Sequence, residues 1–126
     1  MNARRFLLPL ALSLATVTCA CRSNNSYETG QEPDAVGLVV RNEGFVDFDV
    51  YAVASGLATR IGTVTGGNTQ RFELSSSIYN ASDLRIVGTP MGGNGRASTG
   101  PLSVSRGRTI YFTIAPLVSA SSVSIR

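Results

Sequence analysis

From Ala35 to the C-terminus, apolar residues alternate with polar ones in short runs, and this period-two pattern constrains the fold more than any other feature. In "VGLVV" the alternation places Val36, Leu38 and Val40 on one face. It continues in "FDVYAVA", "TRIGTVT", "QRFEL", "LRIVG", "PLSVS" and "TIYFTIA". Because successive side chains of a strand point to opposite faces of a sheet, these runs predict strands with one buried face.

The runs are separated by turn-forming segments such as "SG", "GGN", "GGNG" and "RG", and no segment shows a sustained helical period. Short strands with Gly-rich turns are typical of an all-β sandwich or barrel. We therefore predict a single antiparallel β-sandwich of about seven strands over residues 35–126, of immunoglobulin-like size and unassigned topology. The strands are expected at residues 36–41, 47–54, 59–65, 69–74, 83–90, 98–105 and 108–115, and "SSVSI" could add a final edge strand.

The inward positions of these strands define the predicted core. A fold of this kind buries the apolar face of each sheet against the other. The core is expected to contain Val36, Leu38, Val40, Phe48, Val50, Val64, Phe72, Leu74, Leu84, Ile86, Leu102, Val104, Ile110, Phe112 and Ile114.

The first 20 residues have the layout of a secretory signal peptide: a positive start, an apolar run, and small residues before a cysteine. Arg4 and Arg5 supply the charge. The apolar run has about a dozen residues, fewer than the roughly 20 that span a bilayer as a helix. We expect residues 1–20 to be the signal peptide. The polar residues 21–34 should form a flexible tether that spans about 20 Å as a coil.

The two cysteines, Cys19 and Cys21, lie one residue apart at the end of this segment. A disulfide between them would need a very small ring. "TCAC" resembles the lipobox of bacterial lipoproteins, with the small Ala20 before Cys21, although Thr18 replaces the usual Leu. The resemblance implies that Cys21 is an acylated N-terminus, and Arg22 after it implies the outer membrane of a diderm bacterium. Two alternatives stay open: ordinary cleavage nearby, which leaves a soluble secreted or periplasmic protein, and cysteines that are discarded or inert.

Composition limits the functions that this chain can perform. Its 126 residues suffice for one domain. The formal charge of +3 includes Arg4 and Arg5, so it falls to about +1 without the signal peptide, and no basic stripe points to nucleic acid. The chain contains no His, the commonest general base and metal ligand, and no cysteine beyond Cys21. We therefore expect no enzymatic activity and no cofactor.

A second resemblance concerns the domain itself. "FVDFDVYAV", followed by "IGTV", "RFEL" and "GRTIYFTI", is similar to small β-sandwich modules of bacterial envelope proteins. Those modules carry a "DVYV" strand and finish on a Gly-led strand. The likeness covers about residues 36–116, and "ASGLAT" replaces the tight turn that often follows "DVYV". The resemblance implies a sandwich with a binding or structural role and without catalytic residues.

Glu43, Asp47 and Asp49 are candidate calcium ligands, because clustered carboxylate oxygens bind Ca²⁺ and two of the three project from one side of a strand. The EF-hand spacing is absent, and a solvated strand start explains the same residues. The Gly-rich "GTPMGGNG", residues 88–95, lacks the Lys and the Ser or Thr of a phosphate-binding loop. We expect it to be a hairpin connection.

Tyr51 and Tyr111 are the candidate binding residues, because they alternate with the core positions Val50 and Phe112 and so face outward. If both lay on one face, they could form a platform for a glycan or a protein partner, since Tyr is enriched at interface hot spots. The alternative is that each ring covers its own sheet beside an arginine, with no ligand.

These observations favour a non-catalytic envelope lipoprotein, a binding or structural module anchored to a bacterial membrane. The alternative is a soluble secreted β-sandwich that binds glycan or a partner protein, and an enzyme is a distant third. The partners implied are the membrane, through the lipid, and a protein or glycan, with no nucleic acid.

The anchor hypothesis predicts the behaviour of Cys21→Ser. The variant should leave the membrane fraction and lose the mass increase that acylation adds, because no other group would hold it there. Cell fractionation and mass spectrometry check both points. Wild-type protein found wholly in the soluble fraction would contradict an anchor at Cys21.

Overall fold

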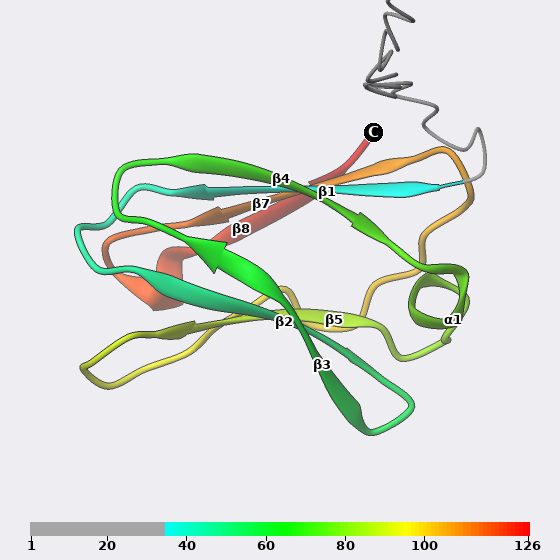
Figure 1. The fold of residues 1–126 in the computed structure, drawn as a ribbon, viewed down its shortest axis with the longest axis horizontal. Helices are drawn as coiled ribbons and strands as arrows, with labels where there is room; N and C mark the ends of the chain where they lie inside the picture. The colour runs from blue at the N-terminus through cyan, green and yellow to red at the C-terminus, as the bar shows by residue number, and fades with distance from the viewer. Residues whose placement is uncertain (1–34) are drawn as a thin grey trace, which may run out of the picture.

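The computed structural model describes residues 35–126. In this part of the chain two four-stranded sheets pack face to face as an all-β sandwich (Figure 1). The strands in chain order are β1 (Val36–Asn42), β2 (Phe48–Ala54), β3 (Leu57–Val64), β4 (Thr69–Leu74), β5 (Arg85–Pro90), β6 (Ala97–Ser98), β7 (Thr109–Ile114) and β8 (Ser122–Ile125).

One sheet has the order β4-β1-β7-β8 and the other has the order β3-β2-β5-β6. The predicted fold class, an antiparallel β-sandwich, is confirmed. One pairing in the described residues departs from it, because β1 and β7 run parallel, with Leu38 opposite Ile110 and Val40 opposite Phe112. A parallel pair needs a long crossover between its strands, and here the whole second sheet lies between β1 and β7 in the chain.

The apolar faces of the two sheets form the core, as the alternation predicts. Every residue predicted for the core is buried except Phe72 and Val104, which are half-buried and pack against its margin. Phe72 lies over Gly62, where an added Cβ would come within 2.5 Å of the phenyl ring. The ring therefore covers the edge of the sandwich near the connection from β3 to β4.

The strand predicted at residues 98–105 is wrong. Only Ala97 and Ser98 pair with β5, and Leu102 makes an isolated bridge to Leu84. Gly100 has a φ of 73° and Pro101 has no backbone N–H, so this stretch cannot continue a ladder. The "SSVSI" segment does form a final strand, β8, which pairs with β7.

The described residues also contain two short helical turns, which the apolar periodicity did not predict. The helix α1 (Ser76–Tyr79) follows β4 and buries Tyr79, and the 3₁₀ turn η1 (Val118–Ala120) precedes β8. Four or fewer residues are too few to display a helical period. Neither turn in residues 35–126 has the length and apolar character that crossing a membrane would require.

The two ends of the sandwich differ in what they carry (Figure 1). The chain enters at the start of β1, and the β2–β3 hairpin and α1 lie at the same end. The connections β1–β2, β3–β4, β5–β6 and β7–β8 all lie at the opposite end, on the left of the figure. Met91 N–H donates to the Asp47 carbonyl and Gly67 N–H donates to the Gly44 carbonyl, which ties three of these connections together.

The position of Phe112 yields a stability prediction. Its side chain is 1% exposed at the centre of β7, whereas the neighbouring Tyr111 faces outward. Phe112→Ala should lower the free energy of unfolding by about 3–5 kcal/mol, because it leaves a large cavity between the sheets. Chemical denaturation measures the loss, and Tyr111→Ala is the control that should cost much less. Equal costs would show that the inward face of β7 is misassigned.

Candidate functional site

Exposed apolar side chains gather at the end of the sandwich that lies away from the N-terminal strand start. Phe45 is 98% exposed, and Val46, Met91 and Leu117 are also exposed. They belong to three connections, β1–β2, β5–β6 and β7–β8, which meet at this end (Figure 1). The other large apolar side chains exposed in the described residues are dispersed: Leu57, Tyr111 and Ile125. We call the cluster of Phe45, Val46, Met91 and Leu117 the apolar loop end.

A pocket of about 250 Å³ lies beside Phe45 and Val46 of the apolar loop end. This volume is below the roughly 300–1,000 Å³ typical of small-molecule sites, so the pocket suits one or two side chains better than a whole ligand. No charged side chain lines it. Its walls are Gly44, Phe45, Val46, Phe48, Pro90, Gly92, Gly93, Asn94, Ala115, Pro116 and Val118.

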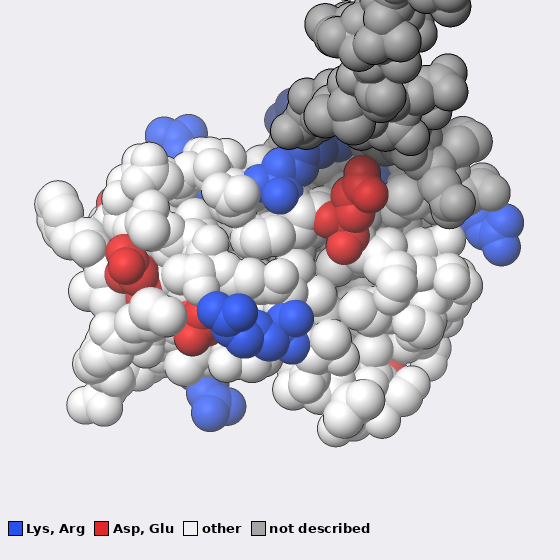
Figure 2. Space-filling view, viewed as in Figure 1, with Lys and Arg blue, Asp and Glu red and all other residues white. Residues whose placement is uncertain are grey.

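The charged groups around this pocket are few and of both signs. In Figure 2 isolated acidic and basic groups are scattered over the visible face, and an acidic group lies near its left end, where the loops lie. The Arg41 guanidinium lies 3.3 Å from the Glu43 carboxylate at the end of β1, and these two charges offset each other. The pocket and the exposed apolar side chains beside it therefore suit contact with apolar groups better than with ions.

The buried side chain of Asn42 holds the β1–β2 connection through hydrogen bonds to its backbone. Asn42 is the last residue of β1 and is 1% exposed. Its Nδ2 donates to the Val46 carbonyl at 2.7 Å, and its Oδ1 accepts from Gly44 N–H at 2.9 Å. A buried amide is stable only when its hydrogen bonds are made. These bonds curl the chain between Gly44 and Val46, so that Phe45 at the apex points into solvent.

The β3–β4 connection supports the same loop from the side. Gly66 N–H donates to Asp47 Oδ1 at 3.0 Å, and an added Cβ at Gly66 would come within 2.5 Å of the Phe45 carbonyl oxygen. Only a glycine permits this close approach of two backbones. The apex that carries Phe45 is thus held by fixed backbone contacts on two sides.

The predicted calcium site is not assembled. Glu43 pairs with Arg41, Asp47 accepts from Gly66 N–H, and Asp49 bonds to residues of β3. Within residues 35–126 no three carboxylates lie close enough to hold one metal ion. The three residues are near in sequence, but each carboxylate has a different partner.

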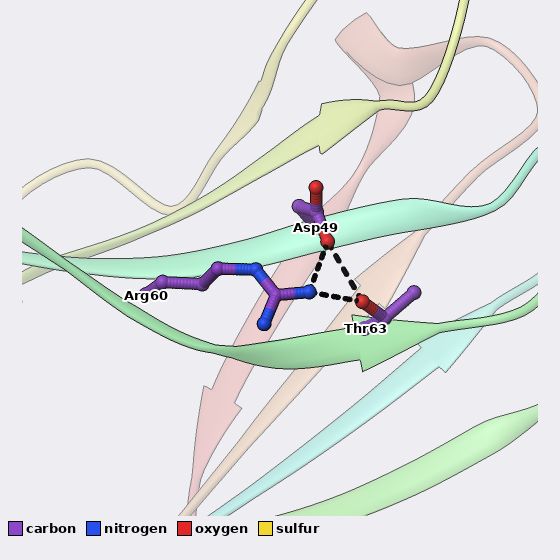
Figure 3. Close-up of polar contacts among 3 residues, drawn as sticks. All are labelled: Asp49, Arg60 and Thr63. Atoms are coloured by element: carbon purple, nitrogen blue, oxygen red, sulfur yellow. Dashed lines mark hydrogen bonds and ion pairs between the residues drawn. The ribbon is translucent and has the colours of Figure 1, made fainter.

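Asp49 belongs to a polar network on the outer face of the β2–β3 pair (Figure 3). Arg60 Nη2 lies 2.8 Å from Asp49 Oδ1 and 2.7 Å from Thr63 Oγ1, and the Thr63 hydroxyl donates to Asp49 Oδ1 at 2.7 Å. The hydrogen bond from Thr63, followed by that from Arg60, lowers the pKa of the Asp49 carboxyl below its ordinary value. The network thus favours the ionised form of this carboxylate, which is hydrogen-bonded to Arg60 and Thr63.

A β-bulge makes this network possible. Val50 pairs with Gly62, whereas the next residue, Tyr51, pairs with Arg60, so Ile61 is the extra residue. In a regular strand, Arg60 and Thr63 would point to opposite faces, because they are three positions apart. The bulge re-aims one of them, as bulges commonly do.

The shared platform predicted for Tyr51 and Tyr111 does not exist. Tyr51 is on β2 and Tyr111 is on β7, and these strands belong to opposite sheets. Each ring faces outward as predicted, but from a different side of the sandwich. The Arg126 guanidinium stacks 5.5 Å from the Tyr111 ring, and Tyr51 lies opposite Arg60 in the ladder. Each tyrosine therefore covers its own sheet beside an arginine.

Sequence reasoning missed the residues of the apolar loop end. A signal was present: "EGFVD", "TPMGGNG" and "APLVSA" each place bulky apolar residues inside Gly- or Pro-containing connections, where polar residues are usual. The predicted lipidation residue Cys21 lies outside the residues that the structure describes.

The buried amide of Asn42 gives a testable prediction. Asn42→Ala should lower the free energy of unfolding by roughly 1–3 kcal/mol, because it leaves buried backbone groups of the β1–β2 loop without partners. Amides of residues 44–47 should also exchange faster with deuterium. The control is Asn80→Ala, at an exposed asparagine after α1, which should change stability by less than about 0.5 kcal/mol. Unchanged exchange at the loop would contradict the role given to Asn42.

Four chains of solved structures match this chain, and the similarity of the one compared here is limited. No protein family and no curated protein matches the chain. The solved structure is described as the NMR structure of a protein from Eubacterium rectale. Its alignment has 10% sequence identity and a TM-score of 0.48, and it covers 73% of this chain and 88% of the other.

Proposed function

We propose that this protein is a non-catalytic binding module of the bacterial envelope, anchored through Cys21 and binding its partner through the apolar loop end. The anchor rests on the sequence, in which a signal peptide and a lipobox-like "TCAC" precede the polar residues 22–34. The binding role rests on the exposed apolar side chains of the loop end, of which Phe45 is the most exposed.

The observation that carries the proposal is that the N-terminal strand start and the apolar loop end lie at opposite ends of the domain. β1 begins with Val36 at one end, and the connections that contain the exposed residues Phe45, Met91 and Leu117 lie at the other (Figure 1). A tether attached before Val36 would therefore hold the domain by the end remote from its apolar loops. This arrangement keeps the loop end accessible.

The exposure of the loop end supports binding on energetic grounds. Leaving Phe45 almost fully exposed forfeits the burial of a large apolar side chain, which typically contributes about 1.5–3 kcal/mol. An exposed apolar cluster on a folded protein commonly marks an interaction site. The pocket beside Phe45 presents glycine backbone and apolar side chains, which suit contact with another apolar surface.

A native-size experiment tests this function. Membranes carrying the wild-type chain are solubilised in a mild detergent, and the size of the assembly is measured by native electrophoresis. The wild type should migrate as a complex larger than one chain. Phe45→Asp should migrate as a single chain, because a charge replaces the apolar apex.

The matched control is Leu57→Asp, which changes a residue that is also exposed, 69%, but lies at the opposite end in the β2–β3 hairpin. This variant should keep the wild-type size. A wild-type protein that migrates as one chain would contradict the binding role. Loss of the complex in both variants would contradict the assignment of partner binding to the loop end.

A further inference from the structure

We propose that the partner of the apolar loop end is a second copy of the same chain, in a two-fold contact in which Phe45 of each copy enters the pocket of the other. This inference rests on the proposed binding role of the loop end. It adds the identity of the partner and the geometry of the contact.

The first argument is self-complementarity. A two-fold interface needs one patch that carries both a projecting group and a matching hollow, because the same surface is used on both copies. The apolar loop end has both: Phe45 projects at 98% exposure, and the pocket of about 250 Å³ lies beside it. The pocket offers room for a bulky side chain, and its floor and walls include Phe48, Pro90 and Val118.

The second argument is charge. A two-fold contact places a patch against itself, so any net charge near the axis would meet a like charge, which is costly. The pocket lining contains no charged side chain, and the nearby Arg41 and Glu43 form an ion pair. The pocket that receives Phe45 therefore presents no like charge to its own copy, and the charged residues Asp47 and Arg96 of these connections lie outside its lining.

The third argument is the position of the chain ends. Val36 begins β1 at the end remote from the loops, and Arg126 pairs with Thr109 at the start of β7, at that same end. In a contact between loop ends, the two N-terminal strand starts lie at the outer ends of the pair. A coil with the 13-residue length of the segment 22–34 would span about 20 Å, which would let two copies anchored in one membrane meet in this way.

Membrane anchoring also lets a small interface suffice. Three short connections per copy supply few contacting residues, whereas a stable interface typically uses about 20–30 residues on each side. Two copies confined to one membrane surface have a raised effective concentration, which makes weak contacts productive. The pair is therefore expected in the membrane, and the test is made there.

The experiment places the photo-crosslinking residue p-benzoylphenylalanine at position 45 in cells that express two versions of the full chain with different C-terminal tags. Phe45 is solvent-exposed, so the replacement leaves the core intact. Illumination should give a product with the mass of two chains that carries both tags. The crosslinked peptide should map to residues 90–94 or 116–118. The same probe at position 57 should give no such product.

A second measurement uses side-chain replacement without a crosslinker. Co-isolation of the two tagged versions should fall by roughly thirtyfold in Phe45→Asp, the loss expected when an interface anchor is removed. Leu57→Asp should leave co-isolation unchanged.

The outcomes separate this inference from the function on which it rests. A probe at position 45 that crosslinks to a different protein, or to lipid, overturns the second copy as partner while the loop end keeps its binding role. Absence of any crosslink, together with a wild type that migrates as a single chain, overturns both. Co-isolation of the two tagged versions that persists in Phe45→Asp overturns the proposed geometry.

Discussion

Burial of apolar side chains between the two sheets is the interaction on which the rest of this structure depends, because residues 35–126 contain no cysteine and so no disulfide. β1 lies inside its sheet, antiparallel to β4 and parallel to β7. Its inward side chains, Val36, Leu38 and Val40, are fully buried. A domain of this size keeps only a small net stability after the entropy of ordering the chain is subtracted. Each buried position of β1 and β7 therefore contributes to the stability of the domain. The two sheets form the base from which the loops project.

Asn42 connects this base to the loop end. The apolar alternation of β1 stops at this residue, where a buried amide replaces a buried methyl group. Its bonds to Gly44 and Val46 turn the chain, and the Phe45 side chain at the apex lies in solvent rather than on the core. The bond between Gly66 and Asp47 fixes the other side of the turn. Satisfied polar groups and a close backbone approach thus hold the apex that exposes Phe45.

The sequence predicted the strands and their inward faces, which depend on local alternation. It did not predict the features that depend on how distant strands pair. Alternation identified the inward faces of β1 and β7, because a strand's period is fixed by its geometry. It could not predict that β1 and β7 run parallel, since pairing joins residues far apart in the chain. It also gave the outward direction of Tyr51 and Tyr111 but not the sheet to which each belongs. The network around Asp49 depends on the bulge at Ile61, which the alternation does not reveal. The loop end was missed because its apolar residues come from three separate connections, which only the fold brings together.

The central claim is that the apolar loop end is covered by a partner when the protein is in its membrane. Hydrogen–deuterium exchange tests it most directly, with the protein compared in the membranes of its own cells and as single copies in lipid nanodiscs. The account predicts slower exchange in the membranes at residues 44–47 and 91–94. The β2–β3 hairpin around Leu57 should exchange at the same rate in both states. Equal exchange at residues 44–47 in the two states would contradict the claim.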